Sequence, residues 1–107
     1  MPDFVGRIDF EAVPEIPVPG ETFTVKVYLV NESRKPLRIK AVNLVLTAND
    51  RKTPSAPAPL VREIAPTQRA AVAELRMVWG ADVTSWSLEA VVTSDRDETG
   101  TSRLSWN

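Results

Sequence analysis

Carboxylate groups are the main candidates for chemistry in this chain of 107 residues, because it contains no histidine and no cysteine. Histidine is the commonest general base and transition-metal ligand, so its absence argues against a Ser-His-Asp arrangement. Without thiolates as well, zinc and iron-sulfur sites are excluded. The four glycines form neither a GxGxxG nor a GxxxxGK[ST] motif, which excludes phosphate-binding loops of those kinds. We therefore expect no catalytic residues, no cofactor and no enzymatic activity.

The densest group of carboxylates lies in the stretch "SDRDETG", which contains Asp95, Asp97 and Glu98. Oxygen-rich loops can bind calcium, but the twelve-residue pattern of an EF-hand is not present. A hairpin tip is usually polar because it is exposed to water. We favour a solvated hairpin turn here, and a calcium site is the alternative.

Basic residues gather in two places, at Arg34, Lys35, Arg38 and Lys40 and again at 51–52. They suggest a positive patch for an acidic partner, but charges on the exposed side of a sheet also discourage edge-to-edge association. We favour the second explanation. The whole chain has a net charge of -1, so nucleic acid is not an expected partner.

Loops on a rigid scaffold display most binding residues, so we place the candidate partner contacts in loops. These candidates are Arg34, Lys35, Asp50, Arg51, Lys52, Asp95, Asp97 and Glu98.

Three tryptophans, Trp79, Trp86 and Trp106, offer either a sugar-stacking platform or core packing. All three are in phase with the apolar residues of their predicted strands, which favours core packing. Trp106 is the exception to watch, because its ring would be exposed if the last strand paired loosely.

Strict alternation of apolar and polar residues defines the elements that must carry these groups. In "TFTVKVYLVN", residues 22–31, every second side chain from Phe23 to Leu29 is apolar, which predicts a strand with one buried face. Similar patterns predict strands at 4–12, 37–47, 60–64, 71–79, 86–94 and 102–106. A helix is the second choice for 71–79, because alanine, leucine and methionine favour helices.

Two segments break the pattern. The apolar phase inverts near Lys40 and Ala41, which predicts a β-bulge or kink there. Residues 48–59, "ANDRKTPSAPAP", are polar and proline-rich, which predicts a long exposed loop.

Seven short antiparallel strands with few helix signals predict an all-β fold, a seven-stranded immunoglobulin-like β-sandwich that forms a single domain over 1–107. The residues predicted to form its core are Phe23, Val25, Val27, Leu29, Leu44, Leu75, Trp86 and Leu88.

The segments "PGETFTVKVYLVNES", "IAPTQRAAV" and "WSLEAVVTSD" resemble CARDB-like and related immunoglobulin-like domains of bacterial and archaeal multidomain proteins. One departure is Pro66-Thr67, where that family usually has Pro-Gly. In local terms, Gly20 suits a tight turn and Asn31 is placed to bond the main chain near the strand end. The resemblance implies a ligand-binding, adhesion or spacer module without catalytic residues.

We therefore expect a non-catalytic protein-interaction or spacer module of a larger bacterial assembly or surface protein. A carbohydrate-binding or calcium-dependent adhesion module is the alternative. The expected partner is a protein. Self-association through an edge strand is a second possibility for the first strand, although pairing within its own domain is favoured.

Membrane insertion is not expected, because no stretch approaches the ~20 apolar residues of a membrane span. The expected soluble domain would be extracellular or periplasmic in a secreted parent protein and cytoplasmic otherwise.

Overall fold

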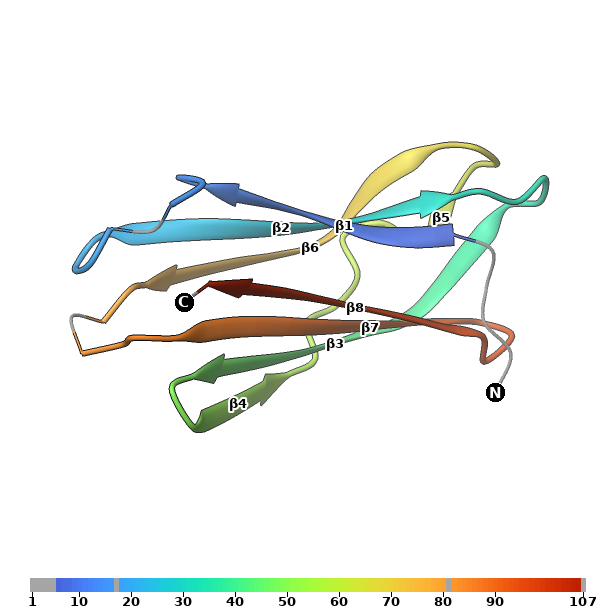
Figure 1. Cartoon of the computed structure of the whole chain (residues 1–107). Helices are drawn as coiled ribbons and strands as arrows, with labels where there is room; N and C mark the ends of the chain where they lie inside the picture. The colour runs from blue at the N-terminus through green and yellow to red at the C-terminus, as the bar shows by residue number, and fades with distance from the viewer. Residues whose placement is uncertain (1–5, 17, 81, 107) are drawn as a thin grey trace.

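The structure is a computed structural model that describes residues 6–16, 18–80 and 82–106. These residues form two antiparallel β-sheets (Figure 1). The three-stranded sheet has the order β1-β2-β6, and the five-stranded sheet has the order β4-β3-β7-β8 with β5 paired to β3. The strands are β1 (Gly6–Val13), β2 (Thr22–Asn31), β3 (Leu37–Ala48), β4 (Arg51–Ser55), β5 (Glu63–Ile64), β6 (Arg69–Val78), β7 (Trp86–Ser94) and β8 (Thr99–Trp106). The all-β prediction is confirmed, with eight strands instead of seven.

Both sheets contribute side chains to one hydrophobic core. The apolar residues of β2 predicted from alternation, Phe23 to Leu29, are at most 2% exposed. Burial of each such side chain contributes about 1.5–3 kcal/mol before chain entropy is subtracted. Of the other predicted core residues, Leu44, Trp86 and Leu88 are buried, whereas Leu75 is half-buried against the core.

The kink predicted in the third strand is confirmed. The pairing of β3 with β7 shifts register between Ile39 and Ala41, so Lys40 has no partner in β7. Before the shift, Leu37 and Ile39 are the buried residues, and after it Val42 and Leu44 are. The bulge is therefore the physical cause of the inverted apolar phase.

The prediction of a long loop over 48–59 is wrong for residues 51–55 and for Ala48, the last residue of β3. Residues 51–55 form β4, which pairs with β3 from Ala48 to Leu44 at the edge of the sheet. All five residues of β4 are exposed, so the strand has no apolar alternation that the sequence could reveal. Pro54 is tolerated because an edge strand needs only half of its hydrogen-bonding groups. The strand predicted at 60–64 is shorter than expected and spans only Glu63–Ile64.

The strand choice for 71–79 is confirmed, but strict alternation with Ala71 and Ala73, which would place Val72 on the solvent side, does not hold. Val27 pairs with Ala73 whereas the next residue, Tyr28, pairs with Ala71, so Val72 is the extra residue of a bulge. Its side chain is fully buried instead of facing solvent.

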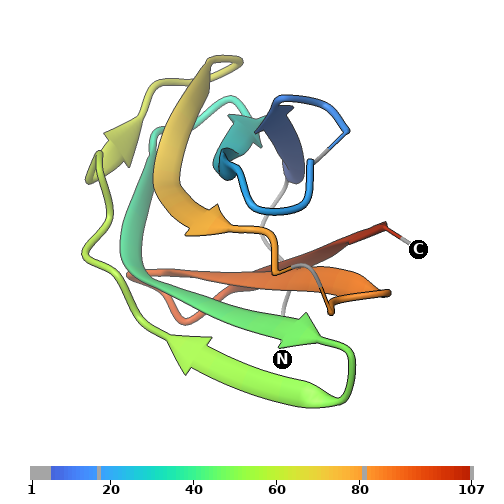
Figure 2. The same cartoon turned by 90° about the vertical axis from the view of Figure 1, so that its left-hand side faces the viewer.

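The strands run along the long axis of the molecule (Figure 1), and the principal extents are 44 × 24 × 21 Å. Figure 2 looks along this axis and shows the three-stranded sheet above the sheet that contains β3, β4, β7 and β8. The start of β1 and the end of β8 lie at opposite ends of the axis (Figure 1). The register agrees, because Gly6 pairs with the end of β2 while Trp106 pairs with Trp86, next to the end of β3. The described residues include no helix that is long and apolar enough to cross a membrane.

The turn before β2 depends on Gly20, whose φ of +84° lies in the left-handed region. Its N–H donates to the Trp79 carbonyl at 2.7 Å, which ties the turn to the end of β6. No heavy atom lies within 4 Å of a Cβ built at this position, so a substitution costs backbone strain and no collision.

We expect Gly20→Ala to reduce the free energy of unfolding in urea by about 1–2 kcal/mol. Gly20→Asn should lose less, because asparagine tolerates this conformation. Equal stability of the alanine variant and the unmodified protein would contradict the assigned turn.

Candidate interaction site

The predicted contact residues lie at the two ends of the long axis and do not form one surface. We use the term β2–β3 end for the end that holds the β2–β3 loop, β5 and the β7–β8 hairpin. The term β3–β4 end is used for the end that holds the β1–β2 loop, the β3–β4 turn and residues 82–85. Arg34, Lys35 and the hairpin carboxylates are at the β2–β3 end, and Asp50 and Arg51 are at the β3–β4 end (Figure 1).

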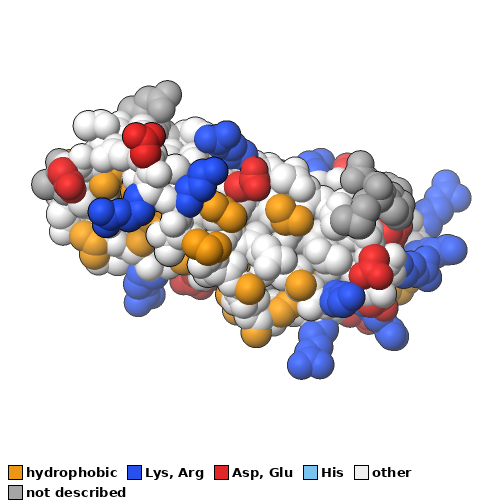
Figure 3. Space-filling view, turned by 90° about the horizontal axis from the view of Figure 1, so that it is seen from below, with side chains coloured by type: hydrophobic (Ala, Val, Ile, Leu, Met, Phe, Trp, Pro, Cys, Tyr) orange, Lys and Arg blue, Asp and Glu red, His pale blue; other side chains and the backbone are white. Residues whose placement is uncertain are grey.

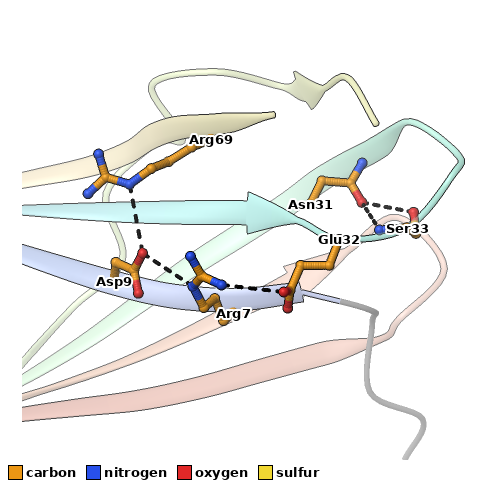
Figure 4. A network of polar contacts seen from close by, with 6 residues as sticks. All are labelled: Arg7, Asp9, Asn31, Glu32, Ser33 and Arg69. Carbon is orange, nitrogen blue, oxygen red and sulfur yellow. Dashed lines mark hydrogen bonds and ion pairs between the residues drawn. The ribbon is translucent and has the colours of Figure 1, made fainter. Parts of the chain in front are cut away.

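Asn31 organises the β2–β3 loop from a fully buried position. Its Nδ2 donates to the carbonyl oxygens of Lys35 at 2.8 Å and Ile64 at 3.0 Å. Its Oδ1 accepts from the N–H of Ser33 at 3.0 Å and from the Ser33 hydroxyl at 2.8 Å (Figure 4). The predicted bonding of Asn31 to nearby main chain is confirmed, and the bond to Ile64 adds an anchor for β5.

Ser94, at the end of β7, organises the β7–β8 hairpin in a similar way. Its hydroxyl accepts from the N–H groups of Arg96 at 3.3 Å and Glu98 at 3.1 Å, and donates to the Glu98 carboxylate at 3.4 Å. Asp97, with a φ of 61°, forms an exposed ion pair with Lys40 at 2.9 Å. The carboxylates of Asp97 and Glu98 therefore have different partners. Within 6–16, 18–80 and 82–106, no group of three or more metal-ligating side chains is assembled.

A recess forms between the β2–β3 loop and the hairpin. Lys35, Pro36, Arg38, Asp95 and Arg96 line two adjoining hollows of about 180 and 300 Å³. Leu37 and Glu98 add to the smaller hollow and Glu63 adds to the larger one. We call this pair of hollows the basic recess. The structure thus brings the predicted residues Lys35, Asp95 and Glu98 together.

The cations around the basic recess are only partly neutralised. Arg38 is paired with Glu63 at 3.2 Å. In contrast, none of the described carboxylates lies within 4 Å of Arg34, Lys35 or Arg96. Lysine and arginine side chains project from this end of the molecule (Figure 3). Asp95, Glu98 and Glu63 line the same hollows, so three carboxylates lie among the cations of the recess.

The other predicted contact residues lie far from the basic recess. Asp50 and Arg51 line an open hollow of about 600 Å³ together with Asn49, Asp82 and Val83. Lys52 borders a separate hollow of about 110 Å³ on the outer face of the five-stranded sheet, with Glu89 and Arg103. A single positive patch that includes both basic groups is therefore wrong, because β3 spans the whole molecule between them.

Asn49 holds the β3–β4 end together and was not singled out by the sequence. Its φ is 53°, its Oδ1 accepts from the N–H groups of Thr84 at 3.0 Å and Ser85 at 3.2 Å, and its Nδ2 donates to the Asp82 carbonyl at 3.2 Å. "AND" before a charged segment is a turn signal, but only the fold reveals the distant partners.

A network of charged side chains on the outer face of the three-stranded sheet was also not predicted from the sequence (Figure 4). Asp9 lies 3.5 Å from Arg7 and 3.8 Å from Arg69, and Arg7 lies 3.4 Å from Glu32. The Arg69 guanidinium is 3.7 Å from the centre of the Tyr28 ring. Exposed pairs of this kind contribute about 0–1 kcal/mol each, so the network is a surface feature and not a main source of stability.

Large apolar side chains are exposed at the β3–β4 end, in and beside the proline-containing β1–β2 loop. They are Val13, Ile16, Val18 and Val78, and we call them the apolar tip.

The prediction that the tryptophans pack in the core is confirmed for Trp79 and Trp86, because both side chains are buried there. The Trp106 side chain lies outside what the structure describes, as does Phe4 of the first predicted strand.

No family model matches the chain, and no curated protein matches its sequence. Solved structures share its fold. Spo0M, a sporulation control protein from Bacillus subtilis, is 11% identical over 94% of this chain, with a TM-score of 0.61. The matched part is 48% of the Spo0M chain, so this chain spans about half the length of that protein.

Two further structures cover nearly all of both chains. AvmM, described as a catalyst of macrocyclization in alchivemycin A biosynthesis, is 15% identical over 97% of this chain and 88% of its own, with a TM-score of 0.65. The CARDB domain of the PF1109 protein from Pyrococcus furiosus, described in complex with di-metal ions, is 9% identical over 98% and 91%, with a TM-score of 0.56. One CARDB domain therefore shares the fold, and identities this low establish no more than the fold.

The prediction that this chain is not an enzyme is contradicted by these comparisons. AvmM is described as a catalyst, and AlkC, an alkylpurine DNA glycosylase from Pseudomonas fluorescens, shares the fold at 10% identity with a TM-score of 0.58. The absence of histidine and cysteine argued only against particular reaction types. Proteins with this fold are associated with catalysis, so the all-β architecture does not exclude an enzyme.

Proposed function

We propose that this chain is an immunoglobulin-like sandwich of the CARDB kind that acts as a protein-interaction or spacer module in a larger bacterial assembly or surface protein. The observation that best supports a spacer is the position of two strand ends. The start of β1 lies toward the β2–β3 end and the end of β8 lies toward the β3–β4 end of a 44 Å axis (Figure 1). Neighbouring segments attached to the two strands would be held apart by the length of the sheets.

The support for an interaction role comes from the loops. Asn31 and Ser94 fix the two loops that border the basic recess, so their side chains are presented by a rigid scaffold. We propose a protein partner, because the net charge of -1 gives no general attraction to nucleic acid. The edge strands β1 and β8 offer a further route to self-association.

The carbohydrate-binding and calcium-dependent alternatives have less support. Trp79 and Trp86 pack in the core and are not available as a sugar platform. In the β7–β8 hairpin, Asp97 pairs with Lys40 and Glu98 bonds to Ser94.

The proposal can be tested by replacing the segment in its native gene. One strain receives a flexible Gly/Ser linker of equal length, and another receives an unrelated two-sheet domain whose termini also lie at opposite ends. Rescue of the deletion phenotype by the unrelated domain alone would support a spacer. Failure of both replacements, with loss of function on charge reversal at Lys35 and Arg96, would support an interaction module. Full rescue by the flexible linker would contradict both roles.

A further inference from the structure

We propose that two copies of this chain associate side by side, through antiparallel pairing of the free edge of β8 with the same edge of the second copy. This inference rests on the proposed interaction function and names a second copy of the chain as the partner. It is carried by the order of the strands, by the composition of the edge strands and by the register that a two-fold axis allows.

β8 is the last strand of the five-stranded sheet, and one of its edges is open. Among the described residues, only those of β7 pair with β8, from Trp86 with Trp106 to Thr93 with Thr99. β1 contacts β8 from the other sheet but is not a hydrogen-bonded neighbour of it. Figure 2 shows the second half of β8 running to the margin of the molecule, away from the three-stranded sheet. A row of main-chain N–H and C=O groups is therefore available to another strand.

The other edge strands carry features that discourage pairing between chains. β4 is only five residues long and contains a proline and two cations. β1 carries the charged residues Arg7, Asp9 and Glu11 along its length. On β6, the Val72 carbonyl accepts from the N–H of Leu60 at 3.0 Å, so a neighbouring segment already covers part of that edge.

β8 has none of these features. Its sequence "TGTSRLSW" contains no proline and a single charged residue, Arg103. Thr101, Arg103 and Ser105 are exposed, whereas Leu104 is half-buried against the core. Every copy of the chain presents the same open edge, and the other described edges are protected. The strand that fits β8 best is therefore β8 of a second copy.

A two-fold axis perpendicular to the sheet limits the register of this pairing. Residues directly opposite each other in an antiparallel pair point to the same face of the sheet. Two registers then give the longest pairing, with 99–105 or 100–106 paired to the same range of the second copy. The second register places Arg103 directly opposite Arg103 of the other copy, and like charges in this position are destabilising. The first register, with Ser102 at the axis, is therefore favoured.

The side chains that face each other in the first register are compatible. On the outer face, Thr101 lies opposite Arg103 of the other copy. On the inner face, Leu104 lies opposite Gly100, which has no side chain, so the half-buried leucine gains cover. A contact between two identical surfaces closes after two copies. Both ends of each molecule stay free, because β8 runs along the long axis (Figure 1).

The test changes the charge at position 101. Thr101→Glu places a carboxylate opposite Arg103 at two symmetric positions of the dimer, whereas Thr101→Lys places a cation there. We expect the first variant to strengthen the dimer and the second to weaken it, each by about threefold to tenfold. Net charge acts in the opposite direction. Glutamate changes it from -1 to -2 and lysine changes it from -1 to 0, so general repulsion between copies predicts the reverse order.

Sedimentation velocity from about 10 μM to 1 mM at low salt, where charges are least screened, measures the association. We expect the sedimentation coefficient to rise to the value of a dimer and no further. The matched controls are Asn43→Glu and Asn43→Lys, because Asn43 is exposed on β3 in the same row of the sheet as Val91 and Thr101. Both controls should associate as the unmodified chain does.

Several results would overturn the proposal. A monomer that persists at 1 mM or oligomers larger than a dimer would do so. An unchanged dimer in both Thr101 variants would place the contact elsewhere. The reverse order of these variants, or equal effects at positions 43 and 101, would mean that net charge and not the β8 edge controls association. None of these results affects the gene-replacement test, which asks whether the segment acts as a spacer or an interaction module.

Discussion

Phe23→Ala is expected to reduce the free energy of unfolding by about 3–5 kcal/mol, a large share of the total for a domain of this size. Phe23 is 2% exposed and lies between two indoles, with ring centroids 5.4 Å from Trp86 and 5.8 Å from Trp79. Removing the ring deletes buried apolar area and leaves a cavity between residues of both sheets. It also removes tilted and edge-on ring contacts worth about 0.5–1.5 kcal/mol each.

Urea unfolding followed by tryptophan fluorescence measures this loss, since both indoles report on the site. Val78→Ala is the matched control, because it truncates an apolar side chain that is 61% exposed, and it should change stability by less than about 0.5 kcal/mol. The two indoles are 6.2 Å apart, so the near-ultraviolet dichroism of the Phe23→Ala variant should change as well. A loss below about 1 kcal/mol would mean that the two sheets do not meet at Phe23.

The burial of Phe23 was predictable because β2 lies in the middle of its sheet. β1 and β6 pair with its two edges, and the other sheet covers one of its faces. Apolar and polar residues therefore alternate along the whole strand. The same reasoning failed for β4, whose residues are exposed on both faces at a sheet edge. It also failed for Val72, because a bulge depends on how a strand pairs and not on its own pattern.

The candidate site was predictable only in part, for a related reason. Sequence patterns place Lys35 and Glu98 in loops, but their meeting depends on β3 and β7 being antiparallel neighbours. The same strand β3 places Asp50, which follows its last residue, at the other end of the molecule from Lys35 and Glu98. The exposed Ile16 was missed because the prolines around it predict an irregular turn and say nothing about which side chains are covered.

The second large effect is expected at Asn31, where substitution with alanine should reduce the free energy of unfolding by about 2–4 kcal/mol. The side chain is 0% exposed and satisfies the carbonyls of Lys35 and Ile64 and the N–H of Ser33. Each buried polar group left without a partner costs about 1–3 kcal/mol, and water reaches this position poorly. The variant should also loosen β5 and the β2–β3 loop, which hydrogen exchange of their amides measures.

Asn49 supplies the matched control, because it makes a similar set of bonds at the other end of the molecule but is exposed. Asn49→Gly removes the side chain while tolerating the φ of 53°, and we expect a loss of only about 1 kcal/mol, since water replaces the lost bonds. Equal losses for the two variants would contradict the importance assigned to burial at Asn31.

Asn31→Asp tests the same contacts through their dependence on pH. An aspartate there would face the carbonyl oxygens of Lys35 and Ile64 without water, and burial beside these dipoles raises the pKa of its carboxyl in the folded state. The folded state then binds the proton more tightly than the unfolded state, so stability is highest in acid and falls as the pH rises through the folded-state pKa. Relative to the unmodified protein, the variant should be more strongly destabilised at pH 7 than at pH 4. A difference that does not change with pH would mean that the carboxylate reaches solvent and that the buried position of Asn31 is wrong.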